Sequence, residues 1–145
     1  MKKRRSHKGI FKPTNPSKYA GDPTRIVWRS SWELRFCKYC DKTDDIIYWA
    51  SEELAIPYTN PITRKRHRYF PDFIIKTKKG KRYMIEIKPL AQTKQPKPRL
   101  KKSRTFMMES LEYIRNVAKW QAADVYCKDN GLEFKIFTEK ELGIY

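Results

Sequence analysis

Two stretches of the chain place hydrophobic residues at the three- and four-residue spacing of an amphipathic helix. The first covers residues 30–42, and its apolar stripe consists of Trp32, Phe36, Tyr39 and Cys40. Ser30 and Glu33 have the S-x-x-E spacing of a capping box at its start. The second covers residues 104–129 and stops before Gly131, a residue typical of helix C-termini. Its stripe consists of Met107, Leu111, Ile114, Ala118, Ala122 and Val125.

Alternation of apolar and polar residues predicts the strands. We expect a strand at residues 53–58, a hairpin over residues 68–89, and a last strand at residues 132–138. Residues 60–67 are rich in turn-forming and basic residues and predict a loop. Thr138 and Glu141 form a second capping box, which opens a short final helix. The order of helix, three strands, helix, strand and short helix predicts one mixed sheet flanked by helices, an αβββαβ core of the α/β or α+β class.

The hairpin turn fixes which residues face each other. Lys78 to Gly80 match a three-residue loop whose last residue is in the left-handed region, which glycine adopts most easily. Asp72 then lies opposite Glu86 on the neighbouring strand. One face carries Asp72, Ile74, Met84, Glu86 and Lys88, and the other carries Phe73, Ile75, Tyr83, Ile85 and Ile87. We expect the second, fully apolar face to form the core under the long helix.

Two carboxylates opposed on neighbouring strands, with Cβ atoms roughly 4.5–5.5 Å apart, repel each other. The protein tolerates this if one acid keeps a proton through a raised pKa, or if a cation lies between them. Carboxylate oxygens suit Mg²⁺ or Mn²⁺, and Lys88 lies on the same face as Glu86. A solvated strand face with a weak surface ion pair is the alternative interpretation. The apolar flanks of both strands favour burial and therefore a cation site.

Composition adds a strong positive charge. The chain has 33 Lys and Arg against 16 Asp and Glu, a net charge of +17, which attracts polyanions. Nucleic acid is the leading partner, ahead of an anionic membrane surface, and a basic structural protein is the alternative. We predict a basic arm at 1–25, a single domain at 26–145 and a basic loop at 90–104. The candidate DNA-binding residues are Lys2, Lys3, Arg4, Arg5, Arg64, Lys65, Arg66, Arg68, Lys94, Lys97, Arg99, Lys101 and Lys102.

The remaining features narrow the class of protein. No apolar run is long enough to cross a membrane, and none follows the basic N-terminus as in a secretion signal. We therefore expect a cytoplasmic protein. Cys37 and Cys40 form a CxxC, but the further ligands that a zinc site needs, Cys127, His7 and His67, lack motif spacing. We expect reduced thiols packed in the core, with zinc as the alternative.

Pro71–Asp72 and Glu86–Lys88, "PD" and "EIK", resemble the motif of the PD-(D/E)xK nuclease superfamily, whose core is also αβββαβ. Longer segments are similar to the head-completion nucleases of large tailed phages. These segments are "WRSSWE" (28–33), "IPY" (56–58), "RYFPDF" (68–73), "IEIKP" (85–89) and "FKIFTE" (134–139). Transposon end-cleaving endonucleases of the same superfamily resemble the chain more distantly.

The resemblance implies a metal-dependent DNA endonuclease. Asp72, Glu86 and Glu33 would be ligands of Mg²⁺ or Mn²⁺, and Lys88 would orient or deprotonate the attacking water or neutralise the phosphate. The capping box also explains Glu33, so Glu52 and Glu53 are further candidate acids, and Gln92 receives no role. Nothing in the sequence resembles a recognition helix or a base-reading motif, so we expect backbone contacts and little sequence preference. The resemblance further implies action on packaged DNA at the phage portal, with portal or neck proteins as partners. Location would be the host cytoplasm during assembly, or the virion. A non-catalytic DNA clamp of the head and a transposition or repair nuclease are the alternatives.

Overall fold

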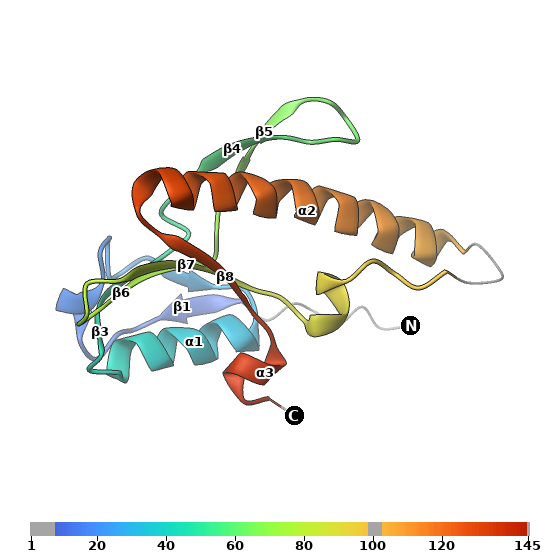
Figure 1. The fold of residues 1–145 in the computed structure, drawn as a ribbon. Coiled ribbons are helices and arrows are strands. Elements are labelled where there is room, and N and C mark those ends of the chain that lie inside the picture. Colours follow the sequence, from blue (N-terminus) through green and yellow to red (C-terminus); the bar gives the residue numbers. More distant parts are fainter. Residues whose placement is uncertain (1–7, 99–102, 145) are drawn as a thin grey trace.

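A computed structural model describes residues 8–98 and 103–144 of the chain. Its centre is a four-stranded sheet in the order β3 (Ile46–Ser51), β6 (Phe73–Thr77), β7 (Arg82–Ile87) and β8 (Glu133–Phe137). The first three strands are antiparallel, and β8 runs parallel to β7. Helix α1 (Ser31–Lys42) lies on one face and α2 (Arg104–Asn130) on the other (Figure 1). The predicted mixed sheet with flanking helices is confirmed.

The smaller elements surround this sheet. They are β1 (Gly9–Phe11), the 3-10 turn η1 (Pro16–Lys18), β2 (Ile26–Trp28), β4 (Ile56–Thr59), β5 (Arg66–Tyr69), the 3-10 turn η2 (Leu90–Thr93) and α3 (Glu139–Leu142). Strands β4 and β5 form a separate hairpin beside α2 (Figure 1). The strand expected at 53–58 is therefore β4 and lies outside the main sheet. The first sheet strand is β3, and the expected loop at 60–67 extends into β5.

The central hairpin has the register expected from its turn. Phe73 pairs with Ile85, and Ile75 pairs with Tyr83. The backbone N–H of Thr77 donates to the carbonyl of Lys81 across 2.9 Å. Gly80 has φ +82°, a left-handed conformation that side chains rarely adopt. The turn residues alone therefore determined which side chains share a face of the sheet.

The apolar face of this hairpin packs against α1, whereas we expected it to pack against the long helix, α2. Phe73 and Ile85 lie in one core cluster with Phe36 and Cys40 of α1. The other face places Met84 in a second cluster with α2. The crossover from β7 to the parallel β8 passes through α2, so that helix must cover the face that carries Met84 and Glu86. The longer of the two helices therefore does not cover the more apolar face of the sheet.

The predicted apolar stripe of α2 is only partly correct, because Ala118 and Ala122 pack against the second core cluster while other members are exposed. Met107, Ile114 and Val125 are 59%, 45% and 60% exposed, and the buried residues of the helix are Asn116, Ala123 and Cys127. Only part of α2 covers the sheet, and its N-terminal half extends past the strands (Figure 1). A helix that overhangs its sheet has no reason to bury a continuous stripe along its whole length. In α1, likewise, Phe36 and Cys40 are buried, whereas Tyr39 is 54% exposed.

Residues 8–25 are not an extended arm, because they pack against the domain. Phe11 and Tyr19 belong to the core. The Lys18 ammonium donates to the carbonyls at the C-terminal end of α1, those of Cys40, Asp41 and Thr43. The buried Asp41 carboxylate accepts hydrogen bonds from the backbone N–H groups of Thr14 and Asn15. The part of the predicted arm at residues 1–7 lies outside the described residues.

The three cysteines are packed thiols, as expected. Cys37 and Cys40 of α1 are fully buried in the first core cluster, and Cys127 of α2 is buried in the second. Burial raises the pKa of the Cys37 thiol to about 12. Among the described residues no helix has the length and hydropathy required to cross a membrane.

Candidate active site

Four acidic side chains converge at one end of the sheet. Glu33 lies in the first turn of α1, Glu52 follows β3, Asp72 precedes β6, and Glu86 lies in β7. Carboxylate oxygens of Glu33, Glu52 and Asp72 lie within 4.8 Å of one another. Three elements distant in sequence therefore bring three negative charges to one point.

Backbone and side-chain contacts hold these acids in place. The Ile87 N–H donates to Oδ2 of Asp72 across 2.8 Å, which ties the carboxylate to β7. The Arg29 N–H donates to Oε2 of Glu33 across 2.5 Å, and the Arg29 guanidinium donates to Glu52 across 2.9 Å. Ser30 also caps α1 by accepting from the Glu33 N–H. The capping role and a place in the cluster are therefore compatible for Glu33.

Glu52 has an unusual backbone. Its φ is +54°, in the left-handed region that residues other than glycine seldom occupy, and its N–H donates to the carbonyl of Asp72 across 3.2 Å. Strained backbone of this kind occurs at functional sites, where the surrounding structure holds it. Among the two candidate acids after β3, the structure places Glu52 in the cluster, whereas Glu53 accepts a hydrogen bond from Tyr19.

Glu86 lies beside this cluster with its own partners. It is 7% exposed, and its Oε2 accepts a hydrogen bond from the Tyr69 hydroxyl. The Lys88 ammonium lies 3.9 Å from Oε1 of Glu86. The tyrosine therefore hydrogen-bonds one oxygen of Glu86, and the lysine forms a longer ion pair with the other. The three other acids have oxygens close to one another.

The surroundings of these acids disfavour their ionised forms. Burial is the main cause that raises the pKa of the Asp72 carboxyl well above its usual value, and the neighbouring Glu86 and Glu33 charges raise it further. Burial and the Glu52 charge likewise raise the pKa of Glu33. Burial raises the pKa of Glu86, although Tyr69, Lys88 and Lys119 act in the opposite direction. Burial, more than mutual repulsion, therefore disfavours the charged forms of these carboxyls, and a bound cation would favour them again.

This donor set fits a divalent cation. Several hard oxygen ligands, close together and partly buried, suit Mg²⁺ or Mn²⁺. A cation would offset the repulsion that raises the pKa of Asp72. Glu33, Glu52 and Asp72 would hold such an ion, and Glu86 adjoins them. When bound, the ion would supply charge neutralisation and a more acidic water.

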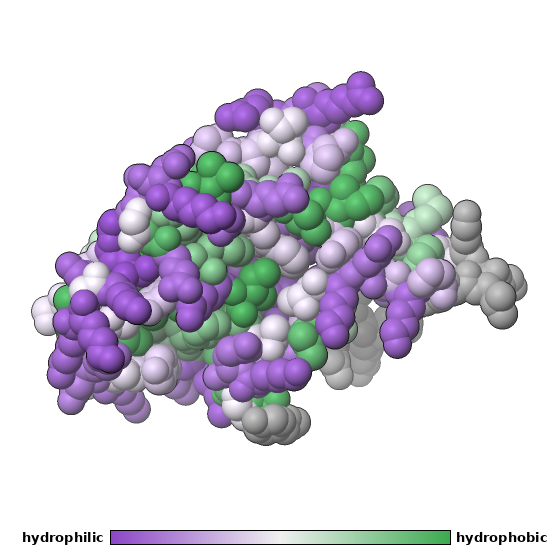
Figure 2. All heavy atoms as spheres, in the orientation of Figure 1, coloured by the Kyte–Doolittle hydropathy of each residue, from purple (hydrophilic) through white to green (hydrophobic). Residues whose placement is uncertain are grey.

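The candidate DNA-binding residues fall into two groups. Arg64, Lys65, Arg66 and Arg68 are exposed on the β4–β5 hairpin, and Lys94 and Lys97 are exposed after η2. On the face of the molecule shown in Figure 2, hydrophilic residues cover most of the surface. The other candidates lie outside the described ranges: Lys2, Lys3, Arg4, Arg5, Arg99, Lys101 and Lys102.

Two residues of the site carried no signal in the sequence. Tyr69 ends β5 and reaches Glu86 from the separate hairpin. The Lys119 ammonium on α2 lies 6.0 Å from the ring centre of Tyr69 and lowers the pKa of Glu86. Neither position belongs to the short motif, and the pairing of the β4–β5 hairpin with α2 had to be known to find them.

The αβββαβ core with clustered acids and a lysine at the sheet end defines a PD-(D/E)xK-type nuclease fold. Comparison with known proteins agrees. The family model described as "TnsA-like endonuclease N terminal" matches residues 43–139, more than half of the chain. The chain is 39% identical, over 141 residues, to the "Head completion nuclease" of Enterobacteria phage T4, and the alignment covers 94% of each protein.

The chain therefore belongs to the TnsA-like endonuclease family. The resemblance noted in the sequence is confirmed. No solved structure matches the chain. The matched range contains Glu52, Asp72, Glu86 and Lys88, whereas Glu33 precedes it.

Proposed function

We propose that this protein is a metal-dependent DNA endonuclease that hydrolyses phosphodiester bonds during phage head completion. The observation that carries the proposal is the convergence of Glu33, Glu52 and Asp72 within 4.8 Å, beside Glu86 and Lys88, in a chain of an endonuclease family. Mg²⁺ is the cofactor we favour and Mn²⁺ its substitute, because all ligands offered are hard oxygens.

The side chains of the site have different roles in hydrolysis. Glu33, Glu52 and Asp72 bind the cation, and Glu86 completes the ligand set or orients a water. Lys88, held 3.9 Å from Glu86, neutralises charge on the scissile phosphate or takes part in deprotonating the attacking water. Lysine suits this task because its ammonium is a compact point charge.

The substrate is held through its phosphates. The net charge of +17 and the exposed basic residues of the β4–β5 hairpin favour backbone contacts with duplex DNA, which carry little sequence information. Among the described residues, we assign these phosphate contacts to Arg64 and Lys65 at the hairpin turn and to Lys94 and Lys97. The remaining candidate basic residues would add to it.

The biological setting follows from the relative of phage T4, which is named a head completion nuclease. We propose that this protein also acts in head completion, in the host cytoplasm during assembly, on packaged DNA at the portal. Portal or neck proteins would be its partners, and the finished virion would retain it if that contact is stable. A transposition or repair role is the alternative that the family description leaves in place.

The decisive experiment compares hydrolysis with binding. Plasmid DNA is incubated with the protein in Mg²⁺ or in EDTA, beside Glu86→Ala and Lys88→Ala, and nicked and linear products are measured. Cleavage that requires the metal and is lost in both variants supports the endonuclease. Salt-sensitive DNA binding without cleavage in Mg²⁺ or Mn²⁺ indicates a DNA clamp instead, and overturns the proposal.

A further inference from the structure

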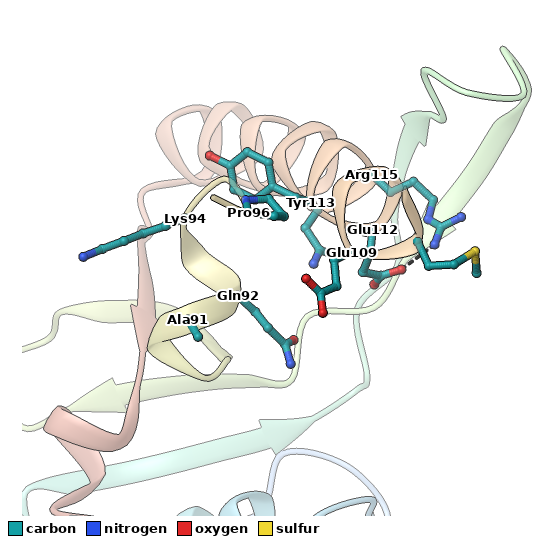
Figure 3. A pocket seen from close by; sticks show the side chains of 10 residues that line it. Ala91, Gln92, Lys94, Pro96, Glu109, Glu112, Tyr113 and Arg115 are labelled. Atoms are coloured by element: carbon teal, nitrogen blue, oxygen red, sulfur yellow. Dashed lines mark hydrogen bonds and ion pairs between the residues drawn. The ribbon is translucent and has the colours of Figure 1, made fainter. Parts of the chain in front are cut away.

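A pocket of about 640 Å³ lies between η2 and the N-terminal half of α2. Ala91, Pro96, Met108 and Tyr113 give it apolar walls, and Gln92 and Asn116 give it two amides. Figure 3 shows Gln92 of η2 and Glu109 and Glu112 of α2 around the same space. The volume is in the range of pockets that bind small organic groups.

Asn116 is a buried amide in the wall of this pocket. The residue is 3% exposed, and its Nδ2 has no hydrogen-bond partner among the described residues. A buried amide donor without a partner is destabilising and calls for an explanation. This nitrogen is covered by protein atoms, so a ligand in the pocket would satisfy it only when the Asn116 side chain turns toward the pocket.

The pocket adjoins the proposed active site. Gln92 follows Lys88 by four residues, at the exit of β7. Arg115, which lies 2.5 Å from Glu112, is the first cause that lowers the pKa of Glu112, and the Lys119 and Lys88 charges act in the same direction. Lys88, which we assign to the scissile phosphate, is therefore close enough to Glu112 in the pocket wall for its charge to act on that carboxylate.

The chemistry of the walls selects the occupant. The walls carry charges of both signs, from Glu109, Glu112, Lys94 and Arg115, and Arg115 is paired with Glu112. The pocket therefore has no net charge that would select a phosphate group, whereas a neutral planar group is compatible with it. An aromatic ring, a proline and a methionine suit stacking against a nucleobase. Amide and carboxylate groups suit the donors and acceptors at the edge of an unpaired base.

We infer that this pocket receives an unpaired nucleobase next to the scissile phosphate, so that the enzyme prefers DNA with unpaired nucleotides over continuous duplex. The inference rests on the proposed endonuclease function for its consequence in cleavage. Stacking of one base on an aromatic side chain corresponds to a preference of about tenfold.

The test uses a blunt duplex and the same duplex with a short unpaired bubble that contains 2-aminopurine. Dissociation constants and 2-aminopurine fluorescence are measured in EDTA, which prevents metal-dependent cleavage. The ratio of cleavage rates on the two substrates is then measured in Mg²⁺. We expect about tenfold tighter binding of the bubble, quenched fluorescence from stacking, and a cleavage ratio of similar size.

Variants test whether the pocket causes the preference for unpaired DNA. Tyr113→Ala removes the ring, and Asn116→Leu removes the buried amide at similar volume. Because Asn116→Leu changes a buried position, Gln92→Leu at an exposed position is the second amide variant. Gln121→Ala is the matched control, since Gln121 is an exposed amide of α2 that does not line the pocket. The pocket variants should bring the bubble-to-duplex ratio toward one and reduce the quenching, while Gln121→Ala keeps both.

The two proposals fail in different ways. Absence of cleavage on both substrates overturns the endonuclease, and the binding and fluorescence data in EDTA still decide on the pocket. Equal binding of bubble and duplex overturns the base pocket. Tighter bubble binding and quenching that persist in Tyr113→Ala and Gln92→Leu also overturn it, because the unpaired base then binds elsewhere.

Discussion

Tyr69 donates a hydrogen bond from its hydroxyl to Oε2 of Glu86, which joins the β4–β5 hairpin to the central strand of the site. The contact lies in a buried environment, with Tyr69 5% exposed. Burial is the first cause that raises the pKa of the Tyr69 hydroxyl, followed by the Glu86 charge. The tyrosine therefore remains a neutral donor that orients Glu86 and leaves its other oxygen directed at Lys88.

Tyr69→Phe is the first variant to test this orientation. Loss of one hydrogen bond to a group beside a metal site typically lowers affinity or activity about 10–100-fold. We expect that loss in the rate of plasmid cleavage, together with a higher Mg²⁺ concentration for half-maximal rate. Tyr58→Phe is the matched control, because Tyr58 is buried in the same cluster. Equal rates for Tyr69→Phe and the wild type would contradict a positioning role.

The adjacent acids Glu52 and Glu53 test whether the cation binds to specific carboxylates. Glu52 shares the cluster with Glu33 and Asp72, whereas Glu53 accepts from Tyr19. We expect Glu52→Gln to weaken Mn²⁺ binding about tenfold or more, measured by titration calorimetry, because a charged ligand is lost. Glu53→Gln should bind Mn²⁺ as the wild type does. Equal weakening in both variants would indicate a general loss of negative charge rather than a specific ligand.

Local patterns in the sequence predicted the part of the site that lies on one hairpin. The Gly80 turn determined the register, and the register placed Asp72 and Glu86 on the same face. Tyr69 and Lys119 depend on contacts between elements far apart in sequence, and no local pattern specifies them. The apolar stripe of α2 was only partly right for a related reason. The pattern shows which residues share a side of a helix, while burial depends on how much of the helix covers the sheet.

Lys18 provides a prediction about stability that is independent of the site. Its ammonium lies 2.8 Å from the carbonyl oxygens of both Cys40 and Thr43, at the end of α1. Lys18→Met leaves these carbonyls without their charged donor, which should lower the free energy of unfolding by about 1–3 kcal/mol. Urea denaturation with an unchanged m-value would measure it. Lys12→Met, at an exposed position of the same segment, should have little effect, and a similar loss there would refute the capping role.

The raised pKa of Asp72 predicts how stability depends on pH. In the unfolded chain this carboxyl has its usual pKa, and in the folded protein its pKa lies well above 3.8. The stability contributed by this group is therefore fully present below the unfolded pKa and is lost as the pH rises through the folded pKa. Without metal, Asp72→Asn should stabilise the protein at pH about 8 by on the order of 1 kcal/mol. At pH about 3, below the unfolded pKa, the Asp72 carboxyl is largely neutral in both the folded and the unfolded state, and the substitution should have almost no effect.

Thermal unfolding in EDTA at several pH values measures this difference, with Asp44→Asn at an exposed position as the control. Mg²⁺ should reverse the order at the higher pH, because it stabilises the wild type by binding the folded state and has lost a ligand in Asp72→Asn. At the lower pH Mg²⁺ should have little effect on either protein, since protons occupy the carboxylates that would bind it. A metal-free Asp72→Asn protein that is less stable than the wild type at the higher pH would show that the Asp72 charge is balanced within the fold, and the case for a cation there would fail.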